Sequence, residues 1–184
     1  MLIEDSKYRL GGASCKRAIK NRSCGFTVIE LLIVMVIIGI AAMMAIPMMT
    51  SAASIQIRSA ANVIAADLEY ARSMAITKGQ NFSVVFDTAT ESYRIQDQAG
   101  AVIRHPVKKG FDYIVDFSSD SRLNKVDIAS VDFDGTSEIK FDYLGSPYNA
   151  GGNPLNSGTV SLQATGASLT VTVEPVTGFI SISD

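Results

Sequence analysis

The sequence is poor in the residues that most often carry chemistry. It has no Trp, one His (His105) and two Cys (Cys15 and Cys24) among 184 residues. Because both Cys precede residue 26, the rest of the chain can form no disulfide and no zinc cluster with Cys ligands. It also lacks a His–Cys pair that could act as base and nucleophile. We therefore expect no enzyme activity, no metal site and no cofactor.

Basic residues are scarce after residue 25. Residues 1–25 hold six Lys or Arg and two acidic residues, a net charge of +4, so the remainder of the chain carries −6. Affinity for nucleic acid depends on clustered Lys and Arg, which an acidic body does not supply. We therefore expect no nucleic-acid partner.

One stretch lacks charge altogether. Leu31 to Met49 contains no ionisable residue, and a helix of that length spans roughly 28 Å, close to the hydrocarbon thickness of a bilayer. This predicts a single membrane span, which includes Leu31, Ile38 and Ile46. The basic leader indicates that residues 1–25 stay in the cytoplasm and the body is exported. A cleaved secretory signal ending at residues 51–53 is the alternative, but the apolar run is too long for it.

Glu30 stands directly before this apolar run. A carboxylate placed deep in a bilayer costs about 2.5–3.5 kcal/mol, so Glu30 either marks the interfacial end of the helix or has a partner of opposite charge.

The string from Gly25 to Leu32, GFTVIELL, resembles the processing site of type IV prepilins and type II secretion pseudopilins. The resemblance implies that a prepilin peptidase cleaves after Gly25 and that Phe26 becomes an N-methylated terminus. It also implies that Glu30 acts in assembly. In a filament the Glu30 carboxylate could then meet the Phe26 ammonium of a neighbouring subunit, which would offset both desolvation penalties.

Helix-forming residues continue from Phe26 to Lys78, where Gly79 predicts the end of the helix. Pro47 predicts a kink or a locally melted turn. Beyond it, apolar residues recur at spacings of three and four, which predicts an amphipathic half packed on a globular head. These residues are Ile57, Ala61, Ile64, Leu68, Ala71 and Ala75.

After Gly79 the period changes to two, which predicts strands. The expected strands are 82–86 and 93–95, joined as a hairpin, 126–133 and 138–143 around Asp134-Gly135, and then 159–163, 168–173 and 179–182. Residues 144–154 are rich in turn formers and predict an exposed, mobile loop. The fold class is therefore α+β, a long N-terminal helix packed on a mainly antiparallel β-sheet head.

Acidic residues of the head offer an alternative site. Their carboxylates could bind Ca²⁺, but their spacing does not match an EF-hand loop, so ordinary solvated acids are the preferred interpretation. They are Asp112, Asp116, Asp120, Asp127, Asp132 and Asp134. His105 is expected to be a solvent-facing residue of a strand or loop.

The C-terminal region resembles the GspH/FimT branch of minor pseudopilins, through Phe141, Gly145, Pro147, residues 158–162 and 171–173, and Gly178. Competence-associated members of that branch bind DNA through a basic tail after the last Gly. Here residues 179–184 contain no Lys or Arg, so that function is not implied.

These observations lead to one hypothesis and one alternative. The hypothesis is a minor pseudopilin of a type II secretion pseudopilus, which acts in filament assembly or tip formation and in protein export. The alternative is a minor type IV pilus subunit for priming, adhesion or DNA uptake. The expected division is a leader at 1–25, a membrane and filament-core helix at 26–49, an amphipathic helix at 50–79 and a head at 80–184. Expected partners are other pilin-like subunits, the prepilin peptidase, an inner-membrane assembly platform and the membrane, with the head in the periplasm.

Overall fold

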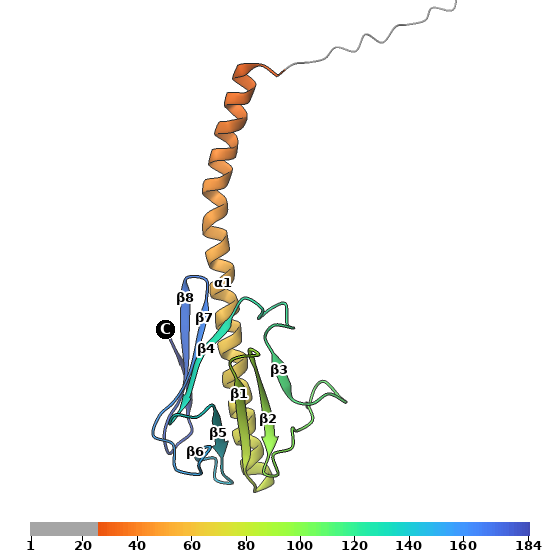
Figure 1. Ribbon diagram of the computed structural model, residues 1–184, viewed down its shortest axis with the longest axis vertical. Coiled ribbons are helices and arrows are strands. Elements are labelled where there is room, and N and C mark those ends of the chain that lie inside the picture. The colour runs from red at the N-terminus through yellow and green to blue at the C-terminus, as the bar shows by residue number, and fades with distance from the viewer. Residues whose placement is uncertain (1–25) are drawn as a thin grey trace, which may run out of the picture. The chain divides into compact units, whose positions relative to one another are not determined.

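The computed structural model describes residues 26–184, with side chains described for 26–43 and 53–184. Helix α1 (Val28–Lys78, 51 residues) is followed by nine strands, β1 to β9 (Figure 1). The chain forms two compact units, Met1–Ala41 and Ala42–Asp184, so α1 contributes to both. Gly25 lies outside the described residues, as does the side chain of Ile46.

The part of α1 in the second unit buries one face. All six residues of the predicted apolar stripe are at most 1% exposed, which confirms the amphipathic half of the helix. The helix ends as predicted, because Gly79 adopts a positive φ of 64° and its N–H donates to the Ala75 carbonyl at 3.0 Å. Helical backbone continues through Pro47, so the predicted melted turn is absent. A proline removes one backbone donor, and a long helix can tolerate that loss.

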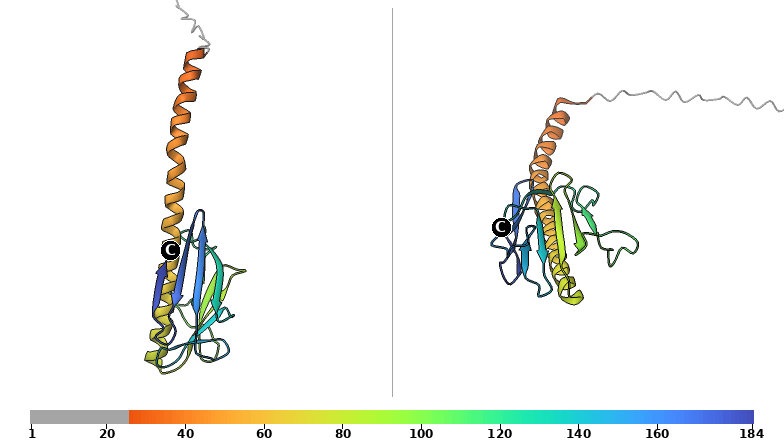
Figure 2. Two further views of the ribbon diagram at one scale, coloured as in Figure 1. Left: turned by 90° about the vertical axis from the view of Figure 1, so that its left-hand side faces the viewer. Right: turned by 60° about the horizontal axis from the view of Figure 1, so that its bottom comes forward.

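The nine strands form two sheets against the head part of α1 (Figures 1 and 2). One sheet has the order β3-β2-β1-β5-β6 and the other the order β4-β7-β8-β9, and every pairing is antiparallel. The predicted α+β class is thus confirmed. The strands are β1 (Phe82–Asp87), β2 (Ser92–Asp97), β3 (Ile114–Asp116), β4 (Asp127–Phe133), β5 (Glu138–Phe141), β6 (Pro147–Asn149), β7 (Gly158–Ala164), β8 (Ala167–Val173) and β9 (Ile180–Ser183).

The predicted hairpin of the first two strands is present, with Val84 opposite Ile95. The two strands around Asp134-Gly135 also exist, but they belong to different sheets. β4 pairs with β7, while β5 pairs with β1. Residues 134 and 135 both have positive φ, and the turn that contains them leads the chain from one sheet to the other. The chain therefore changes from one sheet to the other at Asp134-Gly135, where the sequence pattern predicts two strands around a turn.

The prediction of an exposed loop at 144–154 is wrong in part. Strand β6 lies within it, and Gly145 and Pro147 are buried. Proline is compatible with this place because it begins an edge strand. The Nζ atom of Lys140 also donates to the Ala150 carbonyl at 2.9 Å and ties the segment to β5. The three-residue strand β3 was not predicted either.

The core lies between α1 and the two sheets, and its aromatic side chains come from both sheets and a loop. Phe86 contacts Tyr93 at a centroid distance of 5.2 Å and Phe133 at 5.9 Å, so this ring crosses from one sheet to the other. The small Ala residues of the helix let the sheets approach it closely. The largest fully buried side chains are Tyr93, Phe117, Phe133, Phe141, Ile57, Ile64, Leu68, Ile95, Leu123, Ile139, Leu162 and Val84.

Candidate functional site

The first turn of α1 is capped by Thr27. The Glu30 N–H donates to Thr27 Oγ1 at 3.2 Å and to the Thr27 carbonyl at 3.1 Å. Thr27 is therefore the N-cap and Glu30 is the third residue of the helix, the spacing of a Thr-x-x-Glu capping pattern. Sequence reasoning missed this role of Thr27, although the pattern is visible in the sequence. A carboxylate in the first turn also interacts favourably with the helix dipole.

The Glu30 carboxylate has no hydrogen-bond or ion-pair partner within residues 26–184. Phe26, four residues earlier, is 78% exposed. The fold thus leaves both predicted assembly residues open at the start of the described chain. Their roles remain predictions.

Apolar side chains surround Glu30 on every side of the helix. From Val28 to Met43 the large hydrophobic side chains are 44–84% exposed, Leu31 and Ile38 among them. An apolar surface that covers all faces of a helix is normally buried by lipid or by other helices. Within the part of the chain that the structure describes, no helix meets the length and hydropathy expected of a membrane span.

One acidic group of the head, Asp67, is partly buried and bonded to two tyrosines. Asp67 of α1 accepts hydrogen bonds from the Tyr93 hydroxyl at 2.6 Å and the Tyr113 hydroxyl at 2.8 Å. Burial raises the pKa of the Asp67 carboxyl, while the two hydroxyls and the nearby His105 oppose that shift. Burial and the Asp67 charge also raise the pKa of Tyr93 well above its usual range. This cluster joins the helix to β2 and to the loop before β3.

His105 lies in a loop and is half-buried, so the expectation of a solvent-facing residue is only partly correct. Its ring stacks on Tyr113 at a centroid distance of 4.5 Å. Its Nδ1 atom accepts hydrogen bonds from the N–H groups of Val107 and Lys108, both at 3.1 Å. His105 therefore shapes its own loop.

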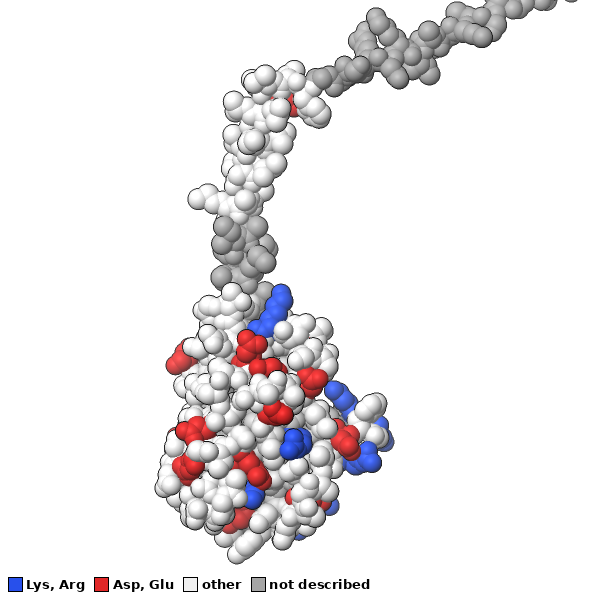
Figure 3. Space-filling model, in the orientation of Figure 1, with Lys and Arg blue, Asp and Glu red and all other residues white. Residues whose placement is uncertain are grey.

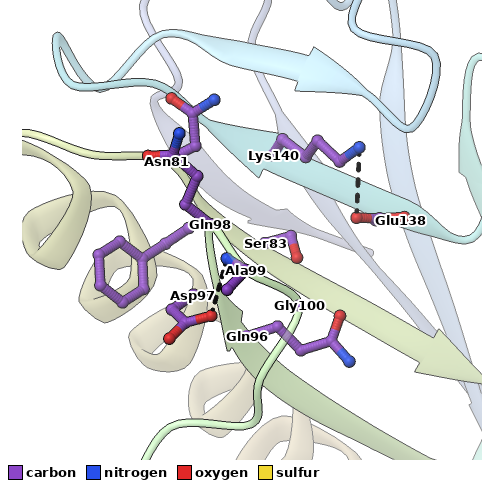
Figure 4. Close-up of a pocket in the computed structure, with 10 residues that line it drawn as sticks. Asn81, Ser83, Gln96, Asp97, Gln98, Ala99, Gly100, Glu138 and Lys140 are labelled. Carbon is purple, nitrogen blue, oxygen red and sulfur yellow. Dashed lines mark hydrogen bonds and ion pairs between the residues drawn. The ribbon is translucent and has the colours of Figure 1, made fainter.

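A polar hollow of about 330 Å³ lies where β1, β2 and β5 meet the turn after β2 (Figure 4). Its charged side chains form hydrogen bonds or ion pairs within the head. Asp97 accepts the N–H groups of Ala99 and Ala101, and Lys140 lies 3.6 Å from Glu138. Ser83 is the one hydroxyl that lines it, with no His in the lining to act as its base. The hollow therefore holds no set of groups for nucleophilic catalysis.

The acidic residues considered as calcium ligands serve mostly in turns. Asp116 accepts the N–H groups of Ser118 and Ser119, and Asp134 accepts that of Ser157. Hydrogen bonds from Arg122 lower the pKa of Asp120 to about 2. Among the described residues, no three His, Cys, Asp or Glu are grouped so that they could hold a metal ion.

Comparison with known proteins gives two family matches. Residues 20–46 match the prokaryotic N-terminal methylation motif, and residues 60–177 match the type II transport protein GspH. No curated protein sequence matches the chain.

Two solved structures are similar to the chain. The minor pseudopilin EpsH of the Vibrio cholerae type 2 secretion system is 14% identical, with a TM-score of 0.49, and the match covers 70% of this chain and 96% of that one. The type IV minor pilin FimU of Pseudomonas aeruginosa is 17% identical, with a TM-score of 0.48, and the match covers 70% and 88%. Because the GspH match spans residues 60–177 of 184, more than half of the sequence, this chain belongs to the GspH family of type II transport proteins.

Proposed function

We propose that this chain is a minor pseudopilin that enters a type II secretion pseudopilus through its N-terminal helix. The observation that carries the proposal is the start of α1, where an unpaired carboxylate lies within an apolar surface that covers every face of the helix. The methylation motif over residues 20–46 supports it, because its span includes Phe26 and Glu30. The function is structural, through contacts between subunits.

The chemistry of assembly follows from charge pairing. After cleavage behind Gly25, Phe26 would carry an ammonium group, and methylation of the nitrogen keeps it able to carry charge. In an apolar bundle an unpaired carboxylate and an unpaired ammonium each carry a desolvation penalty of several kcal/mol. Pairing the Glu30 of one subunit with the Phe26 terminus of its neighbour offsets both penalties. A mismatch in register leaves both charges unpaired, so the pair would also fix the axial position of the subunit.

The topology of the proposal follows the charge asymmetry of the chain. The leader, with a net charge of +4, would remain in the cytoplasm, where a prepilin peptidase removes it. Residues 26–49 would lie in the membrane before extraction into the filament by an inner-membrane platform. The β-rich head at 80–184, carried by the amphipathic segment 50–79, would lie in the periplasm.

The test is mass spectrometry of the mature chain, combined with Glu30→Ala. The wild-type chain is expected to begin at a methylated Phe26 and to co-purify with filament subunits. Glu30→Ala should be processed normally, but the amount of the chain incorporated into filaments should fall by tenfold or more. Glu69→Ala, an acid of the same helix within the head, is the matched control and should incorporate normally.

The outcomes separate the two filament systems. Crosslinked partners from a secretion pseudopilus support the proposal, whereas partners from a type IV pilus would replace it with a role in that pilus. A chain that still begins at Met1, or normal incorporation of Glu30→Ala, contradicts the proposed assembly mechanism.

A further inference from the structure

The loop between β2 and β3 presents a group of positive charges on an otherwise acidic head. Residues 104–111, which we call the basic finger, contain Arg104, Lys108 and Lys109 and no acidic residue. Half of the Lys and Arg that follow residue 25 lie between 104 and 125. Figure 3 shows several blue side chains on the lobe at the right, with a red one beside them, while most of the red ones are spread over the rest of this face of the head.

Two large apolar side chains accompany these charges. Val107 is 82% exposed and Phe111 is 69% exposed, one on each side of the lysine pair in sequence. An exposed aromatic ring beside cations is a feature of docking surfaces, where the ring fills a pocket and the charges orient the encounter. Neither Lys108 nor Lys109 forms an ion pair within residues 26–184.

The basic finger is held in one shape by its own hydrogen bonds. Arg104 Nη1 donates to the Gly110 carbonyl at 3.1 Å and lies 3.0 Å from Asp112. The Phe111 N–H donates to the Lys108 carbonyl at 3.2 Å. Together with the two bonds accepted by His105, these contacts preorganise the loop, so docking would cost little conformational entropy.

The base of the basic finger is fixed to the helix. The Tyr113 ring lies against His105 on the loop and Tyr70 on α1, at centroid distances of 4.5 and 5.5 Å. The Tyr113 hydroxyl also donates to Asp67 of α1. Tyr113 therefore joins the base of the basic finger to the helix through one hydrogen bond and one ring contact.

The direction of the basic finger indicates its partner. The loop stands out sideways from the head part of α1 and from both sheets (Figures 1 and 2). In the proposed filament, the head of another subunit would lie beside this head. Because this head has a basic projection and an acidic remainder, it can form heterologous contacts, in which two different surfaces meet. Contacts of this type can extend into helical arrays. Anionic lipid fits less well, because three cations give only about 1 kcal/mol each at a membrane surface.

We propose that the basic finger docks on an acidic patch of the head of a neighbouring pilin-like subunit, with Phe111 inserted beside that patch. This inference rests on the proposed filament role and names the contact that the head supplies to it. Lys108 and Lys109 steer and hold the carboxylates, and Phe111 supplies the buried apolar area. The contact is lateral and separate from the pairing of Glu30 with a neighbouring terminus.

The experiment places a photocrosslinking amino acid at position 111 of the full chain in cells that assemble the filament. Position 144 is the control, because Leu144 is 68% exposed and lies in another loop. We expect position 111 to crosslink to a head segment of a pilin-like subunit that contains at least two acidic residues, a second copy of this chain included. The variant K108E/K109E should reduce that yield by tenfold or more. R58E/K78E, with the same change in charge, should leave it within twofold.

Three results would overturn the inference. They are crosslinks from position 111 to lipid, crosslinks to a protein that is not pilin-like, and a yield that K108E/K109E leaves unchanged. A lower crosslink yield in K108E/K109E counts only if the thermal unfolding of this variant matches that of the wild type. With the crosslinker moved to position 107, where Val107 is also exposed, F111A provides a second variant without a change in charge. The wild-type chain separates the two proposals. If it is absent from the filament, the proposed function fails, whereas if it is present and the basic finger makes no such crosslink, only this inference fails.

Discussion

Helix α1 contains two stretches that differ in the burial of their apolar side chains. From Val28 to Met43 they cover all faces of α1 and remain exposed. From Ala53 to Lys78 the two sheets bury one stripe of them almost completely, while Ile55 and Ile76 stay exposed outside it. The backbone conformation is the same in both stretches, so the difference lies in what covers the side chains. The second stretch is covered by its own chain, and the first is not.

The comparison predicts that stability and assembly depend on different stretches of α1. Substitutions in the second stretch should change the folding of the head, and substitutions in the first should change association without changing the head. Substitutions in the full chain, kept in detergent, test this division.

The largest effect is expected for Leu68→Ala. Leu68 is fully buried, and removal of a buried Leu side chain costs about 2–5 kcal/mol of unfolding free energy. Leu32→Ala makes the same chemical change at an exposed position and should leave that free energy unchanged. Urea unfolding followed by the near-UV signal of the head measures both. Equal losses would show that the two stretches are not distinct.

Gly145→Ala is expected to cost about 2–3 kcal/mol. Gly145 has a φ of +82°, and an added Cβ atom would lie 2.8 Å from Cδ1 of Ile76 on α1. Gly166→Ala is the control, because its φ is +75° and no atom lies within 4 Å of the added carbon. It should cost only about 1 kcal/mol, from backbone strain alone. Equal losses in urea unfolding would mean that Ile76 moves aside.

Asp67→Asn should remove part of the acid dependence of stability. The pKa of Asp67 is raised above 3.8 in the fold, so between 3.8 and that higher value the native state binds more protons than the unfolded state. The contribution of Asp67 to the unfolding free energy of the wild type therefore falls as pH rises through this window, and is constant above it. The Asn variant should lack this fall. Urea unfolding from about pH 3.5 to about pH 7 measures it, and Glu30→Gln, in the first stretch, should behave as the wild type.

Thr27→Ala should have the smallest effect on the chain as a whole. Loss of an N-cap costs about 1 kcal/mol, and here the loss is confined to the first turn of α1. Hydrogen exchange should therefore be faster at the Glu30 amide and unchanged in the head. Thr27→Ser retains the hydroxyl and should retain the protection. Faster exchange across the head would show that the two stretches are coupled.

The sequence predicted α1 and its buried stripe because both depend on a period that repeats along a local stretch. It also predicted most strands, since alternation is local too. The assignment of strands to two sheets was not predictable in this way. β5 joins β1 rather than its sequence neighbour β4, and Phe133 and Phe141 are both buried in the core that the two sheets share.

The candidate site divides similarly. Glu30 could be singled out because its charge breaks an apolar run, and Thr27 could have been found from its spacing to Glu30. The cluster around Asp67 could not, because its partners Tyr93 and Tyr113 lie 26 and 46 residues further along the chain. The basic finger has charge in its sequence but no periodic pattern, so its shape and direction emerge only from the fold.

The order of the strands has a consequence for how the head folds. β1 with β2, and β7 with β8 and β9, can form as local hairpins. β4 must wait for β7, and β5 must first reach back to β1, so neither sheet is completed by local pairing alone. Such non-local closure is slow. Until both sheets are complete, the stripe of α1 is not fully covered, and the chain has two exposed apolar helical stretches instead of one.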